Sequence, residues 1–196
     1  MIDVREITGM QHLMVSHWHA EAMNNPYHDF LGIACEQHQY NYCLWHEEDI
    51  ARSPDLGDTR IADAKRAIDQ ANQNRNDAIE RMDDAIEQLI HERNVVAHGP
   101  LNTETPGSVI DRLSILALRV YHLEEQLDRV DTGEGHRQDV QLKINICKLQ
   151  HRELSQSLEE LLADLFSGRK RHRTYRQLKM YNDPTLNPYL YARPRA

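Results

Sequence analysis

The stretch VIDRLSILALRVYHLEEQLDRV (residues 109–130) carries apolar side chains at alternating spacings of four and three residues. This spacing places them along one side of an α-helix, where they can face a core. The stripe consists of Val109, Leu113, Leu116, Val120, Leu123, Leu127 and Val130. The stretch 140–165 repeats the pattern with one polar position, His151, which we expect to be a hydrogen-bonded core histidine. Two such stretches predict an all-α fold.

Apolar side chains follow helical spacing in most of the remaining chain, and proline or glycine separates one periodic segment from the next. We expect five main helices and a short sixth, over about residues 3–24, 29–52, 58–97, 105–130, 137–166 and 175–181. The short connections predict antiparallel neighbours, and therefore an antiparallel bundle. Residues 1–182 would form this single domain, and residues 183–196, which contain proline and tyrosine, an extended tail.

Composition restricts the class of protein. A chain of 196 residues is long enough to bury a core without disulfides, and its three cysteines form no CxxC pair. The odd number and wide spacing of the cysteines favour a reducing compartment. The N-terminus carries charges where a signal peptide is apolar, and no long apolar run follows. We therefore expect a cytoplasmic protein without membrane insertion. Its net charge of −8 disfavours general binding to nucleic acid.

The third predicted helix interrupts its own apolar stripe. Continuing from Ile61 at the spacing found elsewhere, Lys65, Asn72 and Arg75 occupy positions that the pattern assigns to the interior. A buried charge costs several kcal/mol, roughly, unless it is paired. These groups therefore neutralise one another, face a wet cleft, or hold a ligand. The ion-pair interpretation joins Lys65, Arg66 and Arg75 to Asp49, Asp69 and Asp83.

The second predicted helix offers an opposing wall. Its polar stripe consists of His38, Tyr42, Trp45, Asp49 and Arg52. In the cleft interpretation, Trp45 stacks on a ring of the ligand. Anionic and hydroxyl groups would bind to the polar side chains of the third helix, namely Lys65, Arg66, Asn72, Arg75 and Asn76.

Two pairs of carboxylate and imidazole groups suggest a metal site. His46 and Asp49 are three residues apart, as are Glu80 and Asp83, and helical bundles hold divalent ions with such groups from facing helices. The hypothesis is a site for an ion such as Mg²⁺, in which Asp49, Glu80 and Asp83 bind the metal or act as a catalytic base. The ion-pair network described above is its alternative.

Four long stretches resemble the bacterial family called domain of unknown function 4254. They are NYCLWHEEDIAR (41–52), AKRAIDQANQNRNDAIERMD (64–83), LNTETPGSVIDRLSILALRVYH (101–122) and YRQLKMYNDPTLNP (175–188). The resemblance implies a helical fold and motif positions at His46, Glu48, Asp49, Arg52, Lys65, Asp69, Asn72, Arg75, Asn76, Asp77, Glu80, Thr103, Glu104, Thr105, Asp111, Arg112, Asn182, Asp183 and Asn187. Members are often encoded near glycosyltransferases of envelope polysaccharide assembly. A phosphorylated or nucleotide-linked sugar is therefore the ligand class that the resemblance implies.

Two further hypotheses remain open. The hexad from Arg93 to His98 resembles the arginine, four residues, histidine signature of HEPN ribonucleases, which would cleave RNA without a metal, although Pro100 replaces their typical tyrosine. Alternatively, the chain is a non-catalytic adaptor for a glycosyltransferase, or a homodimer. Its contact would use the apolar stripe of the fourth helix and three tyrosines near the C-terminus, Tyr181, Tyr189 and Tyr191.

Overall fold

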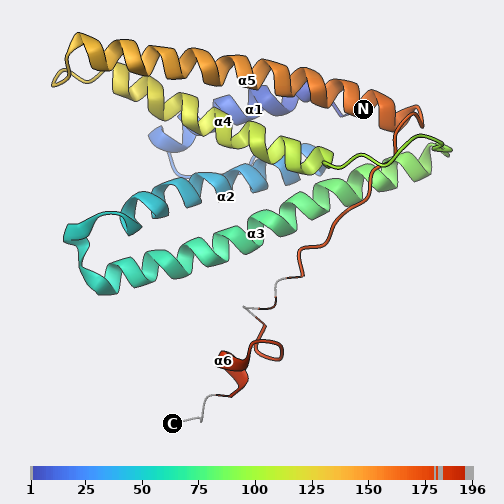
Figure 1. Ribbon diagram of the computed structural model, residues 1–196, viewed down its shortest axis with the longest axis horizontal. Helices are drawn as coiled ribbons and strands as arrows, with labels where there is room; N and C mark the ends of the chain where they lie inside the picture. Colours follow the sequence, from blue (N-terminus) through green and yellow to red (C-terminus); the bar gives the residue numbers. More distant parts are fainter. Residues whose placement is uncertain (1, 179, 181–182, 193–196) are drawn as a thin grey trace.

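The computed structural model describes residues 2–178, 180 and 183–192, and it confirms the all-α bundle (Figure 1). Its elements are α1 (Val4–Ala20), α2 (Asp29–Ala51), a 3-10 turn η1 (Pro54–Leu56), α3 (Gly57–Glu92), α4 (Pro106–Leu127), α5 (Glu134–Phe166) and α6 (Pro188–Tyr191). Within the described ranges the only β-type pairing is an isolated bridge between Leu101 and Arg171. None of the helices in the described part of the chain is both long and apolar enough to cross a membrane.

Two antiparallel hairpins, α2–α3 and α4–α5, make up most of the bundle, and α1 packs mainly against α4 (Figure 1). One pair of neighbours differs from the expected arrangement, because α1 runs parallel to α2. The Nε2 of His38 hydrogen-bonds the carbonyl of Gln11, and the Tyr42 hydroxyl donates to the carbonyl of Trp18. Residue numbers thus rise together along the two helices. Residues 21–28 carry the chain back before α2 begins.

The stripes predicted for α4 and α5 face the core over most of their length, but Leu127 and His151 are only half-buried. The expectation of a hydrogen-bonded core histidine was wrong, because Nε2 of His151 has no partner among the described residues. Val109, Leu113, Leu116 and Val120 are buried on α4, as are most apolar positions of the α5 stripe. The prediction for Val130 was wrong, since its side chain is 94% exposed. The helix ends three residues earlier, at Leu127, so that the spacing no longer determines the direction of this side chain.

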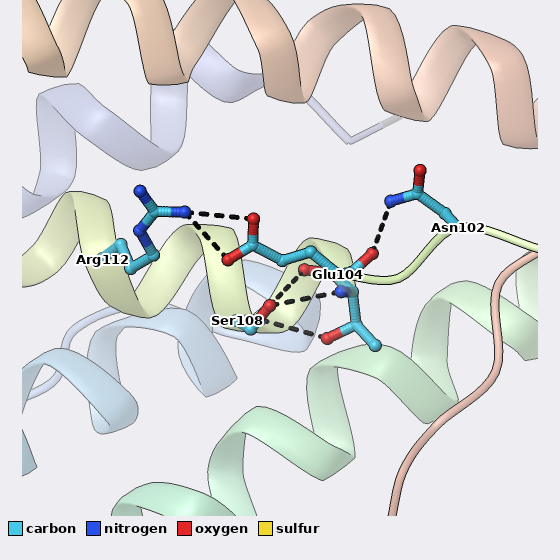
Figure 2. A network of polar contacts seen from close by, with 5 residues as sticks. Asn102, Glu104, Ser108 and Arg112 are labelled. Atoms are coloured by element: carbon cyan, nitrogen blue, oxygen red, sulfur yellow. Dashed lines mark hydrogen bonds and ion pairs between the residues drawn. The ribbon is translucent and has the colours of Figure 1, made fainter.

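The start of α4 is fixed by local polar contacts (Figure 2). Thr105 and Ser108 form a capping box, and Arg112 donates to both oxygens of Glu104 at 2.9 and 3.0 Å. Gly107 lies so close to α3 that an added Cβ would be 2.7 Å from the carbonyl oxygen of Ile79. Only glycine allows this approach. The contact brings the first amides of α4 against the side chains of α3.

The C-terminal segment is extended where a short helix was expected. Residues 175–178 and 180 are not helical, and residues 179 and 181 lie outside the described part of the chain. The backbone amides of Thr174 and Gln177 instead donate to Glu87 and Glu80 of α3. Acceptors on α3 thus replace the hydrogen bonds that a helix would provide. The tail predicted to be extended contains the short helix α6.

Helix α3 also ends earlier than expected, at Glu92 rather than about residue 97. Asn94 adopts a left-handed backbone conformation with φ of 52°, which stops the helix. The next residues pack on the end of α5, where the amides of His98 and Gly99 donate to the carbonyl of Gly168.

Candidate functional site: a cleft between α2, α3 and α4

A cleft of about 350 Å³ opens between α2, α3 and α4. Its lining includes four side chains that the sequence placed in a cleft, namely Trp45, Asp49, Asn72 and Arg75. The remaining lining residues are Asn41, Leu44, Glu48, Arg52, Ile115 and Leu118. Apolar groups of α2 and α4 therefore lie beside polar groups of α2 and α3. The cleft combines an aromatic wall, two guanidinium groups, two carboxylates and two amides.

Arg75 is the most informative side chain of the cleft. Its Nε lies 3.8 Å from Oδ1 of Asp111, which is too long for a hydrogen bond. This nitrogen is inaccessible to solvent and has no hydrogen-bond partner among the described residues. An unsatisfied buried donor costs about 1–3 kcal/mol. Nε itself is enclosed, but the side chain as a whole is 26% exposed and lines the cleft, so its positive charge is available to a ligand there.

Asp111 lies behind Arg75 and is already bonded to the protein. Its Oδ1 accepts hydrogen bonds from Gln37 at 2.6 Å and from Asn41 at 2.9 Å. Burial raises the pKa of this carboxyl, and the charge of Arg75 and the hydrogen bond from Asn41 oppose that shift. Because two amides occupy this oxygen, Asp111 makes no hydrogen bond to Arg75 and holds the guanidinium by charge.

The other two predicted cations lie outside the cleft. Lys65 is 65% exposed at its side chain and forms an ion pair of 2.6 Å with Asp69. Arg66 forms a similar pair with Asp63, and it faces a separate shallow depression beside the C-terminal segment. Asn76 is buried on α3 but does not line the cleft. Of the interior cations proposed from spacing, only Arg75 therefore contributes to this site.

The four residues proposed as a metal site are not brought together. Asp49 lines the cleft, whereas Asp83 accepts a 2.7 Å hydrogen bond from the amide of Gly107, at the start of α4. Asp83 follows Asn72 by eleven residues, which is roughly 16 Å along a helix. Glu80 accepts hydrogen bonds from Arg176 and Gln177. Asp49, Glu80 and Asp83 therefore do not surround one ion or one substrate.

The burial of Asp83 has a structural cause. Loss of solvation raises the pKa of its carboxyl, and hydrogen bonds from Thr105 and Gly107 act in the opposite direction. A carboxylate at this place satisfies an amide at the N-terminus of α4 that has no partner within the helix. This role explains the buried carboxylate on α3 without a ligand.

A comparison with known families can now be made. The family model described as protein of unknown function (DUF4254) matches residues 32–174. The chain belongs to this family. The match confirms the resemblance and covers every residue that lines the cleft. No curated protein and no solved structure shows significant similarity to the chain.

The matched range also contains the hexad that resembles the HEPN signature. Arg93 caps the C-terminus of α3, and its guanidinium carbon lies 4.7 Å from the ring centroid of Phe166. His98 lies in the exposed connection to α4, and its backbone amide donates to Gly168. Both residues thus attach the α3–α4 connection to the end of α5. This geometry favours a structural interpretation, and the comparisons add nothing to the ribonuclease hypothesis.

Sequence reasoning missed a group of rings next to Trp45. The indole of Trp45 stacks on His122 with a centroid distance of 4.6 Å and an interplanar angle of 8°. His19 and His46 contact His122 at centroid distances of 5.1 and 5.5 Å. Burial, and then the charges of His122 and His19, lower the pKa of His46. The three histidines come from α1, α2 and α4, so only the tertiary structure brings them together.

Proposed function

We propose that the cleft binds a small anionic sugar, of which a sugar phosphate is the simplest example. The supporting observation is the guanidinium of Arg75, which lines the cleft with its side chain 26% exposed and is paired only loosely, at 3.8 Å, with Asp111. Guanidinium groups bind phosphate oxygens through charge-assisted hydrogen bonds. Arg52 is a second guanidinium on the same cleft and pairs with Glu48.

The rest of the lining suits the sugar part of such a ligand. The amides of Asn41 and Asn72 and the carboxylate of Asp49 are able to hydrogen-bond hydroxyl groups. Trp45 offers an aromatic face. A volume of about 350 Å³ is at the lower end of the range for ligand sites, roughly 300–1,000 Å³. The size therefore favours a sugar phosphate over a whole nucleotide-linked sugar.

The proposal is that the cleft binds a sugar phosphate, and a reaction of the bound sugar is a separate question. Asp49 is the only one of the three proposed catalytic carboxylates that lines the cleft. It is the candidate base if the bound sugar reacts. The family resemblance suggests envelope polysaccharide assembly as the setting.

Calorimetric titration with glucose 1-phosphate, UDP-glucose, glucose and inorganic phosphate tests the proposal. We expect the sugar phosphate to bind more tightly than glucose or phosphate alone. Arg75→Gln should weaken sugar phosphate binding by about 10- to 100-fold, because a hydrogen bond to a charged group contributes roughly 1.5–3 kcal/mol.

Arg66→Gln is the matched control, because it removes an arginine from the same helix but outside the cleft. Melting temperatures of both variants check that they fold. Equal sugar phosphate affinity in the two variants would contradict the proposal, as would the absence of binding by all four compounds.

A second candidate function is docking on another protein, either a glycosyltransferase or a second copy of the chain. The supporting observation is the exposure of large apolar side chains in the C-terminal tail, including Tyr189 at 80% and Tyr191 at 60%. Deleting residues 183–196 should remove a copurifying glycosyltransferase, or reduce the molecular mass measured by light scattering. Unchanged mass and unchanged partners would exclude docking through this tail.

A further inference from the structure

Three histidines from three helices converge at one place in the bundle. His19 lies in the last turn of α1, His46 in the second half of α2, and His122 in the last third of α4. Each offers one ring nitrogen, and the three nitrogens lie within 4.8 Å of one another. Around a tetrahedral ion with bonds of 2.0–2.1 Å, ligand nitrogens are roughly 3.3 Å apart. Small side-chain rotations therefore suffice to place all three on one ion.

One ring nitrogen of each of the three histidines lacks a hydrogen-bond partner within the described part of the chain. Nε2 is buried in each of His19, His46 and His122 and has no hydrogen-bond partner among the described residues. Because buried polar atoms are nearly always bonded, three such atoms at one place require an explanation. Mutual stacking of the rings does not satisfy the nitrogen lone pairs.

Two of the three rings are already fixed in the tautomer that a metal needs. Nδ1 of His19 lies 2.7 Å from the carbonyl of Val15, and Nδ1 of His122 lies 2.7 Å from Oε2 of Glu125. Both partners accept hydrogen bonds, so in the neutral ring Nδ1 carries the proton and Nε2 carries the lone pair. Histidine ligands of metals usually donate their second nitrogen to a carbonyl or carboxylate in this way.

Aromatic neighbours hold the rings in place. His19 stacks on Tyr121 at 4.2 Å, His46 contacts Tyr42 at 4.5 Å, and His122 stacks on Trp45. The rings therefore keep their orientation without a bond to Nε2. This support reduces the cost of ordering the ligands when an ion binds.

We propose that His19, His46 and His122 form a binding site for a transition-metal ion of the zinc class, coordinated through the three Nε2 atoms. A fourth coordination position is left for water or a ligand oxygen. Imidazole nitrogen suits zinc, copper and nickel, whereas Mg²⁺ prefers oxygen. The site differs from the acidic set considered from the sequence and shares only His46 with it. Trp45, which contacts His122, also lines the cleft.

Metal titration of the untagged, chelator-treated full chain tests the site without any sugar ligand. We expect one Zn²⁺ per chain by calorimetry, and a Co²⁺ complex whose visible spectrum is that of a low-coordinate nitrogen site. At a free zinc concentration about 100 times Kd, the melting temperature should rise by roughly 5–10 °C. His46→Gln should abolish this rise.

His151→Gln is the matched control. His151 is a half-buried histidine whose Nε2 also has no partner in the described chain, but it packs on His12, away from the cluster. Its zinc affinity should equal that of the wild type. Loss of zinc binding only in His46→Gln supports the site. Equal zinc affinity in the wild type and both variants would overturn the proposal. A wild-type titration that shows no single zinc site would also overturn it.

Glu125 supplies a second test that does not remove a ligand. Glu125→Gln weakens the acceptor for Nδ1 of His122 and should lower zinc affinity by about 10- to 100-fold. Glu124→Gln is the control, because Glu124 forms an exposed ion pair with Lys148 instead. If His46→Gln fails to fold, this pair decides the question. Identical zinc affinity in the two glutamate variants would contradict the proposal.

Discussion

The polar interior of the bundle differs between two regions. In the first region, near the start of α4, Asp83 accepts the amide of Gly107, and both nitrogens of His38 are hydrogen-bonded. In the second region, around Trp45, the Nε of Arg75 and the Nε2 atoms of three histidines have no partner among the described residues. Both regions place ionisable groups inside the protein. The atoms named in the first region are hydrogen-bonded within the described part of the protein, whereas those named in the second are not.

The difference shows why burial alone does not identify a functional site. A buried polar group whose hydrogen bonds are made contributes to one unique structure. A buried polar group without a partner is held in a costly position by its surroundings, and a ligand relieves that cost. The first region should therefore control stability, and the second should control binding.

The largest expected effect concerns His38 and acid. Burial lowers the pKa of His38 to about 3, far below its usual 6.5. Between these values the unfolded chain binds a proton that the folded chain does not bind, so stability falls as the pH decreases from 6.5 towards 3. The loss should reach at most about 5 kcal/mol. Urea unfolding of the wild type across this pH range measures it.

His38→Gln should have a lower stability at pH 7 and a smaller decrease in acid than the wild type. His28→Gln, a change at an exposed position, is the control and should keep the wild-type pH dependence. If the His38→Gln protein loses as much stability in acid as the wild type does, this histidine is not the buried neutral group described.

The next effect concerns Asp83. Asp83→Ala leaves the amide of Gly107 without its acceptor and should lower the free energy of unfolding by about 1–3 kcal/mol. Asp84→Ala removes only an exposed ion pair with Arg176 and should cost less than about 1 kcal/mol. Denaturant melts of both variants give the comparison. Similar stability of the two variants would show that the first region is not structural.

The smallest effect concerns the aromatic wall of the second region. Trp45→Leu keeps an apolar side chain but loses the ring, and should reduce sugar phosphate affinity by roughly 3- to 10-fold. Affinity for inorganic phosphate should not change, because phosphate has no face to place against the ring. Competition calorimetry separates the two ligands. A parallel loss for both would mean that Trp45 acts on the shape of the cleft rather than on the sugar.

Much of the fold could be predicted because apolar spacing is a local property of each helix. The buried positions Ile7, Met10, Met14 and Trp18 follow directly from it. Helix ends were less predictable. The left-handed Asn94 stops α3, and contacts with Glu80 and Glu87 replace the expected helix after residue 174. These ends depend on tertiary contacts, which spacing does not show.

The cleft could be predicted only in part, for a geometric reason. Asn72 and Arg75 are adjacent on one face of α3 and both line the cleft. Lys65 precedes Arg75 by ten residues, which places it about 80° away around a helix of 100° per residue. Positions that continue the stripe over several turns therefore rotate around the helix and become exposed to solvent. The spacing of His122 and Glu125 was visible in the sequence, but convergence with His19 and His46 was not.

A crystal structure of the protein grown with a sugar phosphate would test the central claim most directly. We predict the phosphate in the cleft, with an oxygen about 2.7–3.2 Å from the Arg75 guanidinium and the sugar beside Trp45. The contradicting result is a cleft closed by a direct hydrogen bond between Arg75 and Asp111, with the sugar phosphate bound at another place.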